Sequence, residues 1–259
     1  MATPFNYSVI KAFRILTAFK FSGEKLTLSQ LSRRLDMNIA TAHRFLLTLE
    51  SVGAIAKTTD GAFELGLLLA DLGGRVSIIE VMHSAFEPHV RALAESFGET
   101  IHGAILDDGT VCYVAKGEGH RSLTITTHIG KRLPAYCTGL GKALLSMLEP
   151  EELEHCMALQ SFERYTHKTT IGRAELMREI ELTQSRGFAI DDEQVELGLR
   201  CVAVPICCPS IRVKSAISLS APTTRLDQKK IEEVARALKE HGQQIAVSLS
   251  AAPESPQVF

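Results

Sequence analysis

The first 22 residues carry hydrophobic side chains at the spacing of one helix face. Ser8 is a helix-capping residue at the start of this segment, and Ser22-Gly23 is expected to end it. The apolar stripe, which should face the protein interior, consists of Val9, Ala12, Phe13, Leu16 and Phe19. The pattern therefore predicts an amphipathic helix that packs across the elements after it.

Two further helical patterns follow before residue 50, with a polar turn between them. Thr27 and Gln30 have the spacing of a capping box, which predicts that a helix begins there. Its buried positions are expected to be Leu31 and Leu35. Asp36-Met37-Asn38 predicts the turn, and Asn38 can cap the next helix. The apolar face of that helix consists of Ala42, Phe45, Leu46 and Leu49.

The opposite face of the third helix lacks the acids and lysines of an ordinary solvated surface. It presents Ala40, Thr41, His43, Arg44, Leu47 and Thr48. A face with small, hydroxyl and cationic side chains can enter the major groove of DNA. The alternative is a helical hairpin packed inside a helical domain, in which Arg44 has no special role.

Two short strand patterns come next, from Ala54 to Thr58 and from Ala62 to Leu65. Asp60-Gly61 between them is a strong hairpin signal. Three helices followed by a hairpin make a winged helix-turn-helix, so the hairpin weakens the alternative of an ordinary helical domain. The residues expected near base edges are Thr41, His43 and Arg44, with Leu47 against a thymine methyl group. Those expected nearer to phosphates are Thr27, Ser29, Asn38 and Lys57, the last of them close to the wing tip.

Residues 67–86 again carry a helical pattern, interrupted by Gly73-Gly74. Each of the two glycines weakens a helix by roughly 1 kcal/mol relative to alanine. They mark either a hinge in a connecting segment or a place where two helices approach closely. Pro88 and Gly98 bracket the next predicted helix, from Glu87 to Phe97.

From residue 100 onward, strand patterns are interspersed with helical ones. Thr100–Leu106 and Thr110–Lys116 flank the turn Asp107-Asp108-Gly109 and predict a hairpin. The other predicted strands are residues 122–127, 201–206 and 215–219, and the predicted helices are one near Gly139 and those of residues 151–159, 173–186 and 228–249. This order predicts a mixed α/β domain with helices on the faces of a central sheet.

Composition and charge suit a globular protein of two domains. The 259 residues are 45% hydrophobic and 22% charged, which is an ordinary globular composition. The chain has no run of about 18 apolar residues and no basic-then-apolar leader, so we expect a cytoplasmic protein that does not enter the membrane. The net charge is −2, but the first 70 residues carry about +3 and the remainder about −5. A mildly basic small domain joined to an acidic larger one suits a site-specific DNA-binding protein.

The six cysteines include no CxxC pair and have no histidines at zinc-binding spacing. We therefore expect free thiols and neither a metal nor a cofactor. An enzymatic alternative would use Cys201 as nucleophile, His167 as base and Asp191 as the group that orients it. No spacing links the three, and a cysteine on a strand is commonly part of the core. Catalysis is therefore not expected.

The loop Tyr136–Lys142 offers another kind of chemistry. Its two glycines, Gly139 and Gly141, lie where a helix begins, and free amides at such a point can bind a carboxylate. Alternatively, the glycines only form a tight turn. Asp191-Asp192-Glu193 is predicted to be an acidic loop. Ser218 and Ser220 share one face of a predicted strand, near Cys201 on another, and either line a polar pocket or bond to the backbone.

The chain resembles the IclR family of bacterial transcriptional regulators over nearly its whole length. The resemblance rests on the order and spacing of several segments, among them LTLSQLSRRLDMNIATAHRFLLTLESVGAI, RLPAYCTGLGKALL and RGFAIDDEQVELGLRCVAVPI. It implies an N-terminal winged helix-turn-helix domain (1–70), a linker helix (71–86) and a GAF-like α/β effector-binding domain with a central antiparallel sheet (87–252). A flexible tail (253–259) would follow.

The resemblance also implies partners. Members bind double-stranded operator DNA, form homodimers through their DNA-binding domains, often pair into tetramers, and bind a small organic acid or aromatic catabolite. The effector contacts implied for this chain are Gly139, Leu140, Asp191, Cys201, Ser218 and Ser220. One departure is Cys207-Cys208-Pro209-Ser210, where the family commonly has an acidic turn with a glycine. A second domain that only joins subunits is the remaining alternative.

Overall fold

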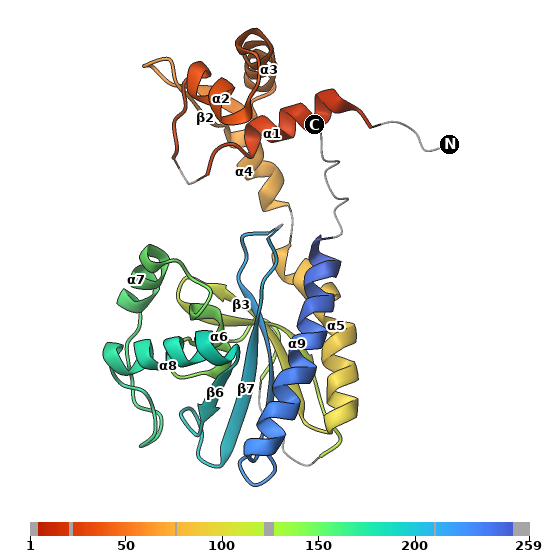
Figure 1. Ribbon diagram of the computed structural model, residues 1–259, viewed down its shortest axis with the longest axis vertical. Coiled ribbons are helices and arrows are strands. Elements are labelled where there is room, and N and C mark those ends of the chain that lie inside the picture. Colours follow the sequence, from red (N-terminus) through yellow and green to blue (C-terminus); the bar gives the residue numbers. More distant parts are fainter. Residues whose placement is uncertain (1–4, 21–22, 76, 122–126, 210, 251–259) are drawn as a thin grey trace. The chain divides into compact units, whose positions relative to one another are not determined.

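The computed structural model describes residues 5–20, 23–75, 77–121, 127–209 and 211–250 (Figure 1). The tail expected at 253–259 and most of the strand expected at 122–127 lie outside these ranges. The chain divides into two compact units, of which the second spans Ile78–Glu254. No helix in the described part of the chain is both long and apolar enough to cross a membrane.

The first unit contains three helices, a two-stranded hairpin and a further helix. Its elements are α1 (Tyr7–Leu16), α2 (Leu28–Leu35), α3 (Ile39–Ser51), β1 (Ile55–Lys57), β2 (Phe63–Leu65) and α4 (Leu67–Gly74). β1 and β2 pair antiparallel around Gly61, whose φ is +83°. Ile15, Leu31 and Leu46 are fully buried in one hydrophobic cluster. The unit is thus a winged helix-turn-helix with its own core.

Capping contacts determine where helices α2 and α3 begin. The Thr27–Gln30 capping box is present, so the predicted start of α2 is confirmed. Asp36 ends α2 in the left-handed conformation, with φ of 48°. Asn38 then caps α3 by accepting a hydrogen bond from the amide of Ala40 at 2.9 Å. These contacts satisfy amides that have no partner inside the helices.

Helix α1 differs from the prediction. It is capped by Asn6 rather than Ser8 and ends at Leu16, before the expected Ser22-Gly23. Val9 and Phe13, expected to face inward, are 51% and 62% exposed, and Ile15 is buried instead. The segment carries apolar residues on more than one side, so the period alone could not decide which side packs.

The second unit is a six-stranded antiparallel sheet with helices on both faces (Figure 1). The strand order is β5-β4-β3-β8-β7-β6. The strands are β3 (Thr100–Asp107), β4 (Thr110–Gly117), β5 (Arg132–Pro134), β6 (Ala189–Asp192), β7 (Leu199–Ile206) and β8 (Ser215–Pro222). The helices are α5 (Ile78–Phe97), α6 (Gly139–Leu145), α7 (Pro150–Ala158), α8 (Arg173–Arg186) and α9 (Gln228–Ser250).

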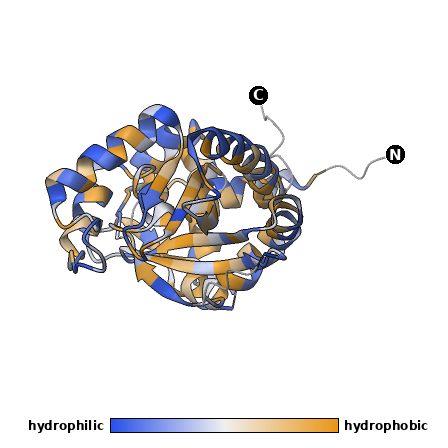
Figure 2. Ribbon diagram, turned by 90° about the horizontal axis from the view of Figure 1, so that it is seen from below, coloured by the Kyte–Doolittle hydropathy of each residue, from blue (hydrophilic) through white to orange (hydrophobic). Residues whose placement is uncertain are grey.

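Two hydrophobic clusters lie on the two faces of this sheet. One joins the strands to α5 and α9, and the other joins them to α6, α7 and α8. Figure 2 shows hydrophobic residues along the strands between the helices. A sheet covered on both faces explains why β3, β4 and β8 are buried at most of their positions.

Two predicted boundaries in this unit were wrong. Helix α5 does not begin near Pro88 but runs through it from Ile78, so residues 71–86 fall on the end of α4 and the start of α5. Met82, Phe86 and Val90 are buried on α5, and their packing holds a helix that proline alone would interrupt. Asp191 and Asp192 lie on β6 rather than in a loop, and Asp191 is buried.

Candidate functional site

The outer face of α3 is open to solvent. Ala40, His43 and Arg44 are exposed, Thr41 is half-buried, and Leu47 is 49% exposed although it is a leucine. Ala42 and Leu46 on the opposite side are buried in the core of the unit. An α-helix held by one apolar face, with a nearly uncharged face outward, has the form of a recognition helix.

The predicted phosphate contacts lie around this helix. Ser29, Asn38 and Lys57 are exposed, the last of them on β1. Thr27 is also exposed, but its hydroxyl oxygen already accepts the Gln30 amide at 3.3 Å as part of the capping box. Thr27 therefore has a structural role in α2, whatever it contributes to DNA binding.

Arg34 on the same helix has a structural partner that the sequence did not reveal. Its guanidinium donates to the Ala18 carbonyl at 2.7 Å and to the Glu24 carboxylate at 2.8 Å. Glu24 is buried, and the ion pair compensates for its loss of hydration. Arg34 thus joins α2 to the segment after α1.

A cavity of about 390 Å³ lies in the second unit, at the lower end of the usual size for small-molecule sites. All six residues expected to contact an effector line it: Gly139, Leu140, Asp191, Cys201, Ser218 and Ser220. They come from α6 and from three neighbouring strands, β6, β7 and β8. Sheet register places Cys201 opposite both Asp191 and Ser220, and its Sγ lies 3.2 Å from the Ser220 Oγ.

Other polar side chains complete the lining. His102, Tyr113, Thr127 and Lys131, which sequence reasoning did not single out, also line the cavity, as does Thr138 of the loop Tyr136–Lys142. His102 lies opposite Ser218 in the β3–β8 register, and its Nε2 is 2.7 Å from the Thr127 Oγ1. Pairing of β3 with β8 joins residues more than 100 positions apart, so only the tertiary structure could reveal this neighbour.

Asp191 and His102, two of the titratable groups that line the cavity, are shifted in the directions that burial dictates. Burial raises the pKa of Asp191 to about 6, against the opposing effects of Lys142 and of the Gln194 amide, which donates to Asp191 Oδ1 at 2.8 Å. Burial, together with Lys116 and Lys131, lowers the pKa of His102 to about 3. The imidazole of His102 is therefore neutral at physiological pH.

The start of α6 is packed more tightly than an open anion site would be. The Gly141 amide donates to the Thr138 Oγ1 at 3.0 Å, so the helix cap occupies it. A Cβ on Gly141 would lie 2.1 Å from the Ala135 carbonyl oxygen, so this glycine is required for close backbone approach. Gly139 lines the cavity, with its missing Cβ facing Cys201 and Asp191. The two glycines thus have different roles.

The residues of the enzymatic alternative do not form a catalytic group. His167 is exposed on the segment between α7 and α8, whereas Cys201 and Asp191 face the cavity. Burial raises the pKa of the Cys201 thiol, and Asp191 raises it further. A thiol with this shift is a weak nucleophile near neutral pH.

The unusual Cys207-Cys208-Pro209 segment lies away from this cavity. Cys207 and Cys208 line a different hollow, and the Cys208 Sγ lies 3.3 Å from the Ser250 Oγ on α9.

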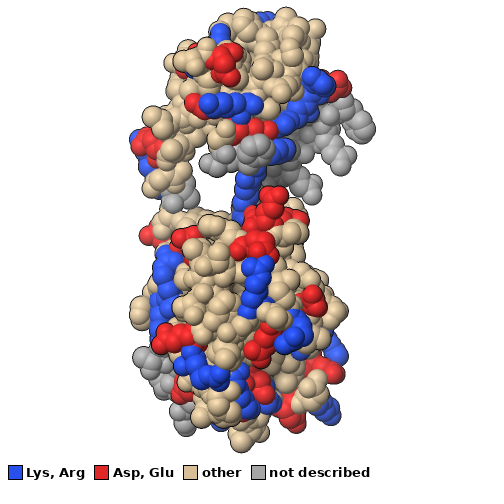
Figure 3. All heavy atoms as spheres, turned by 90° about the vertical axis from the view of Figure 1, so that its left-hand side faces the viewer, with Lys and Arg blue, Asp and Glu red and all other residues tan. Residues whose placement is uncertain are grey.

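Figure 3 shows Lys and Arg intermixed with Asp and Glu over the displayed face of the second unit. That face therefore lacks the single-sign charge that a second nucleic-acid surface would carry.

Comparison with known proteins gives matches to both units. Residues 75–247 match the family model of the C-terminal domain of the bacterial transcriptional regulator IclR, and residues 8–58 match the IclR helix-turn-helix domain. The chain is 32% identical over 241 residues to the HTH-type transcriptional regulator XynR of Escherichia coli K12, covering 92% of this chain and 95% of XynR.

Solved structures agree over both units. The Thermotoga maritima IclR structure has a TM-score of 0.62 and 27% identity, covering 94% of this chain and 99% of that one. An IclR homologue from Microbacterium hydrocarbonoxydans, solved as a complex with 4-hydroxybenzoate, has a TM-score of 0.61 and 24% identity, with 94% and 99% covered. The second likeness establishes the fold alone.

Proposed function

The chain belongs to the IclR family of bacterial transcriptional regulators, and we propose that it binds operator DNA through α3 and the β1–β2 wing under the control of a small acid in its cavity. The observation that carries the proposal is the convergence of six residues from four elements on one cavity of suitable size. A domain that served only to join subunits would not need a buried polar cavity, because burying polar groups costs free energy.

For DNA recognition, we assign the base-reading role to the outer face of α3. Arg44 can donate two hydrogen bonds to a guanine, while Thr41 and His43 can reach neighbouring base edges. Ser29, Asn38 and Lys57 surround this face and suit contacts with phosphates. Because its proposed partner is chromosomal DNA, we place the action of the protein in the cytoplasm.

Replacing Arg44 by alanine tests this assignment. We expect affinity for DNA selected from a random double-stranded library by the wild-type protein to fall about 5- to 150-fold, as loss of a bidentate guanine contact of about 1–3 kcal/mol implies. Fluorescence anisotropy at fixed salt would measure the change. Arg75→Ala removes an exposed arginine that directly follows α4 in the same unit and is the matched control. Equal affinities of Arg44→Ala and wild type would remove Arg44 from the recognition face.

For effector binding, we propose a small carboxylate, aliphatic or aromatic. The hydroxyl groups of Ser218 and Ser220 and the neutral imidazole of His102 provide hydrogen bonds, and Lys131 is the cation among the lining residues. Leu133, Leu140 and Val195 supply apolar contact for the rest of the molecule.

Calorimetry against a panel of small carboxylates, including 4-hydroxybenzoate, tests the effector proposal. A compound that binds the wild type should bind Ser220→Ala about 2- to 10-fold more weakly, because one neutral hydrogen bond is lost. Ser248→Ala, on α9 and outside the cavity lining, should bind it as the wild type does. A panel in which nothing binds would contradict the proposal.

We further propose that the protein acts as a homodimer joined through its first units, with pairing into tetramers. Phe5, Tyr7, Val9 and Phe13 at and along α1 are each more than half exposed. Four neighbouring apolar side chains of this size on a small unit are typical of an interaction surface. A dimer would also present two recognition helices to a two-fold symmetric operator.

A further inference from the structure

The residues that line the cavity range from buried, through partly buried ones such as Cys201, to exposed. His102, Asp191, Ser218 and Ser220 are each less than 5% exposed. The exposed lining residues are Glu196, Leu197 and Gly198, all in the loop between β6 and β7, and Leu197 is 57% exposed. This loop therefore forms the outer wall between the buried ligand groups and solvent.

The loop is closed across its base by Glu193. The Glu193 amide donates to the Leu199 carbonyl at 3.0 Å, and its carboxylate accepts the Gly198 amide at 2.8 Å. Glu193 has φ of 63° and Gly198 has φ of 81°. A glutamate in the left-handed conformation is unfavourable by itself and persists because surrounding contacts hold it.

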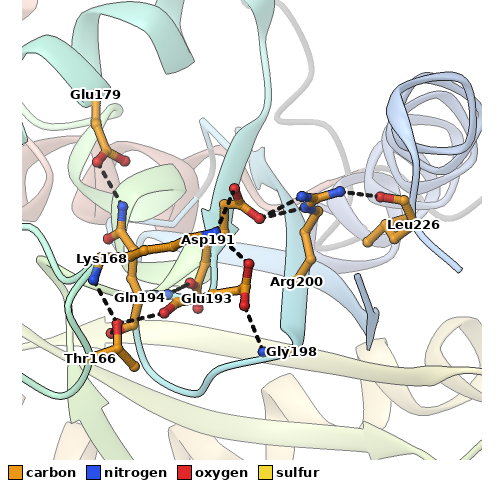
Figure 4. Close-up of polar contacts among 10 residues, drawn as sticks. Thr166, Lys168, Glu179, Asp191, Glu193, Gln194, Gly198, Arg200 and Leu226 are labelled. Carbon is orange, nitrogen blue, oxygen red and sulfur yellow. Dashed lines mark hydrogen bonds and ion pairs between the residues drawn. The ribbon is translucent and has the colours of Figure 1, made fainter. Parts of the chain in front are cut away.

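Those contacts come from the segment between α7 and α8 (Figure 4). Thr166 donates its hydroxyl to the Glu193 carbonyl at 2.7 Å. The Lys168 ammonium forms an ion pair with the Glu193 carboxylate, at a place where both side chains are partly exposed. One carboxylate thus joins an outside segment to the far end of the loop.

A second set of contacts anchors the next residue, Gln194, which is itself buried. The Gln194 amide donates to Asp191, and its side chain donates to Glu179 at 2.8 Å. Glu179 also pairs with Lys142, whose side chain is 1% exposed (Figure 4 shows Glu179 with Gln194). Breaking a buried network costs more than separating a pair at the surface. The loop beyond Gln194 can therefore move while Asp191 and Gln194 remain in place.

We propose that residues 195–198 are the gate of the cavity and that Glu193 is the positioning residue that keeps the gate closed. Lys168 and the Gly198 amide bind different oxygens of the Glu193 carboxylate, and when the carboxylate leaves both of them the wall opens between its two left-handed residues. Small molecules then reach the buried Ser220, and reach the partly buried Cys201 more readily than before. The inference rests on the proposed role of this cavity as the effector site, but its test needs no effector.

Labelling of Cys201 by N-ethylmaleimide measures access to the cavity. Full-length protein would be labelled over time at one fixed alkaline pH, because burial raises the pKa of both thiols, and peptide mass spectrometry would follow Cys201 and Cys137 separately. Cys201 lines the cavity, whereas Cys137 is fully buried and is not one of its lining residues. The Cys201 rate therefore reports gate opening, and the Cys137 rate reports loosening of the whole fold.

Three variants separate the gate from a general structural effect. Glu193→Ala removes both contacts of the carboxylate, whereas Lys168→Met leaves its contact with Gly198 and removes the ion pair with Glu193, together with a longer one to Asp192 at 3.7 Å. We expect Cys201 labelling to accelerate about fivefold or more in Glu193→Ala and less in Lys168→Met, with Cys137 unchanged. The double variant should label no faster than Glu193→Ala, because the two changes break one interaction. Glu181→Gln, on the exposed face of α8, should label as the wild type does.

Two results would overturn the gate. One is a Cys201 labelling rate in Glu193→Ala equal to the rate in the wild type. The other is a Cys201 labelling rate that rises only by the same factor as the Cys137 rate. Failure of the effector proposal has a different signature, because accelerated labelling of Cys201 would persist while no compound in the panel binds.

Discussion

Asp191 shows how one side chain can serve a ligand site at the expense of the fold. Its carboxyl group is buried in the cavity, and its pKa is raised to about 6 from an ordinary value of 3.8. In the unfolded chain the group loses its proton at lower pH. As pH rises from about 4 to 6, the unfolded state therefore ionises first and the free energy of unfolding falls. Above pH 6 the folded protein bears the full cost of the buried charge.

Asp191→Asn should therefore stabilise the protein at neutral pH. The asparagine oxygen can still accept the Gln194 amide, and no charge is buried. From about 1.4 kcal/mol per pKa unit, we expect a gain of about 1–3 kcal/mol at pH 7.5 that disappears near pH 4. Urea denaturation at the two pH values would measure it.

Asp192→Asn is the matched control for this prediction. Asp192 is adjacent on β6, partly exposed and paired with Arg200 at 2.7 Å, so its replacement should give no gain. An Asp191→Asn protein that is less stable than wild type at pH 7.5 would contradict the cost assigned to the buried carboxylate.

His102 has the opposite dependence on pH. Its pKa is lowered to about 3, so between pH 3 and the ordinary value of 6.5 only the unfolded chain takes up the proton. Stability from this residue is present above pH 6.5 and is lost as pH falls. Asp191 and His102 thus make opposite contributions to the change of unfolding free energy with pH. The neutral form of His102 is the one that would contact a ligand.

At the scale of elements, α2 depends on its cap. Its eight residues are too few to form a stable helix alone, so end contacts and packing decide its stability. Thr27 was predicted both to cap this helix and to approach a phosphate, and the capping role is confirmed. The phosphate contact stays a prediction.

Thr27→Ala should loosen α2 locally. Loss of the cap costs about 1 kcal/mol, so amide exchange in peptides covering α2 should accelerate about fivefold. Hydrogen exchange followed by mass spectrometry would measure this change, with α9 peptides as the internal reference. Thr27→Ser keeps the capping oxygen and should exchange like wild type. Unchanged exchange in Thr27→Ala would show that packing alone holds the helix.

At the scale of the whole molecule, each unit has its own core. The first unit is built around Ile15, Leu31 and Leu46, and the second around both faces of its sheet. Helix α1 contributes few side chains to the first core and leaves a larger apolar face exposed. The proposed assembly through this face explains why a surface helix carries so many hydrophobic residues.

Phe13→Glu should therefore weaken self-association. We expect the protein to change from dimer to monomer at micromolar concentration, because a charge would be buried in an apolar interface. Analytical ultracentrifugation would measure the mass, and operator affinity should fall with it. Lys11→Glu introduces the same carboxylate at an exposed polar position of α1 and is the control. A dimeric Phe13→Glu protein would exclude this face as the interface.

Local signals in the sequence determined much of the molecule. The capping box at Thr27, the turn at Asp60-Gly61 and the turn at Asp107-Asp108-Gly109 each act within a few residues, so they predicted the helix-turn-helix, the wing and the first hairpin of the sheet. The order of strand and helix patterns predicted the α/β class, and the motif order predicted the family. The i, i+2 spacing on a predicted strand already allowed Ser218 and Ser220, with Cys201 on the next strand, to line a polar pocket. The resemblance added Asp191, which the sequence pattern had assigned to an acidic loop.

Only the tertiary structure decided what depends on contacts between distant segments. It decided that Val9 and Phe13 face outward, because packing and not period chooses among several apolar sides of α1. Tertiary packing allows α5 to continue through Pro88, and Asp191 lies buried on strand β6. The tertiary structure also brought His102 opposite Ser218 and Lys168 against Glu193, because strand pairing and loop contacts join residues with no sequence relation. The cavity wall and its proposed gate therefore follow from the fold.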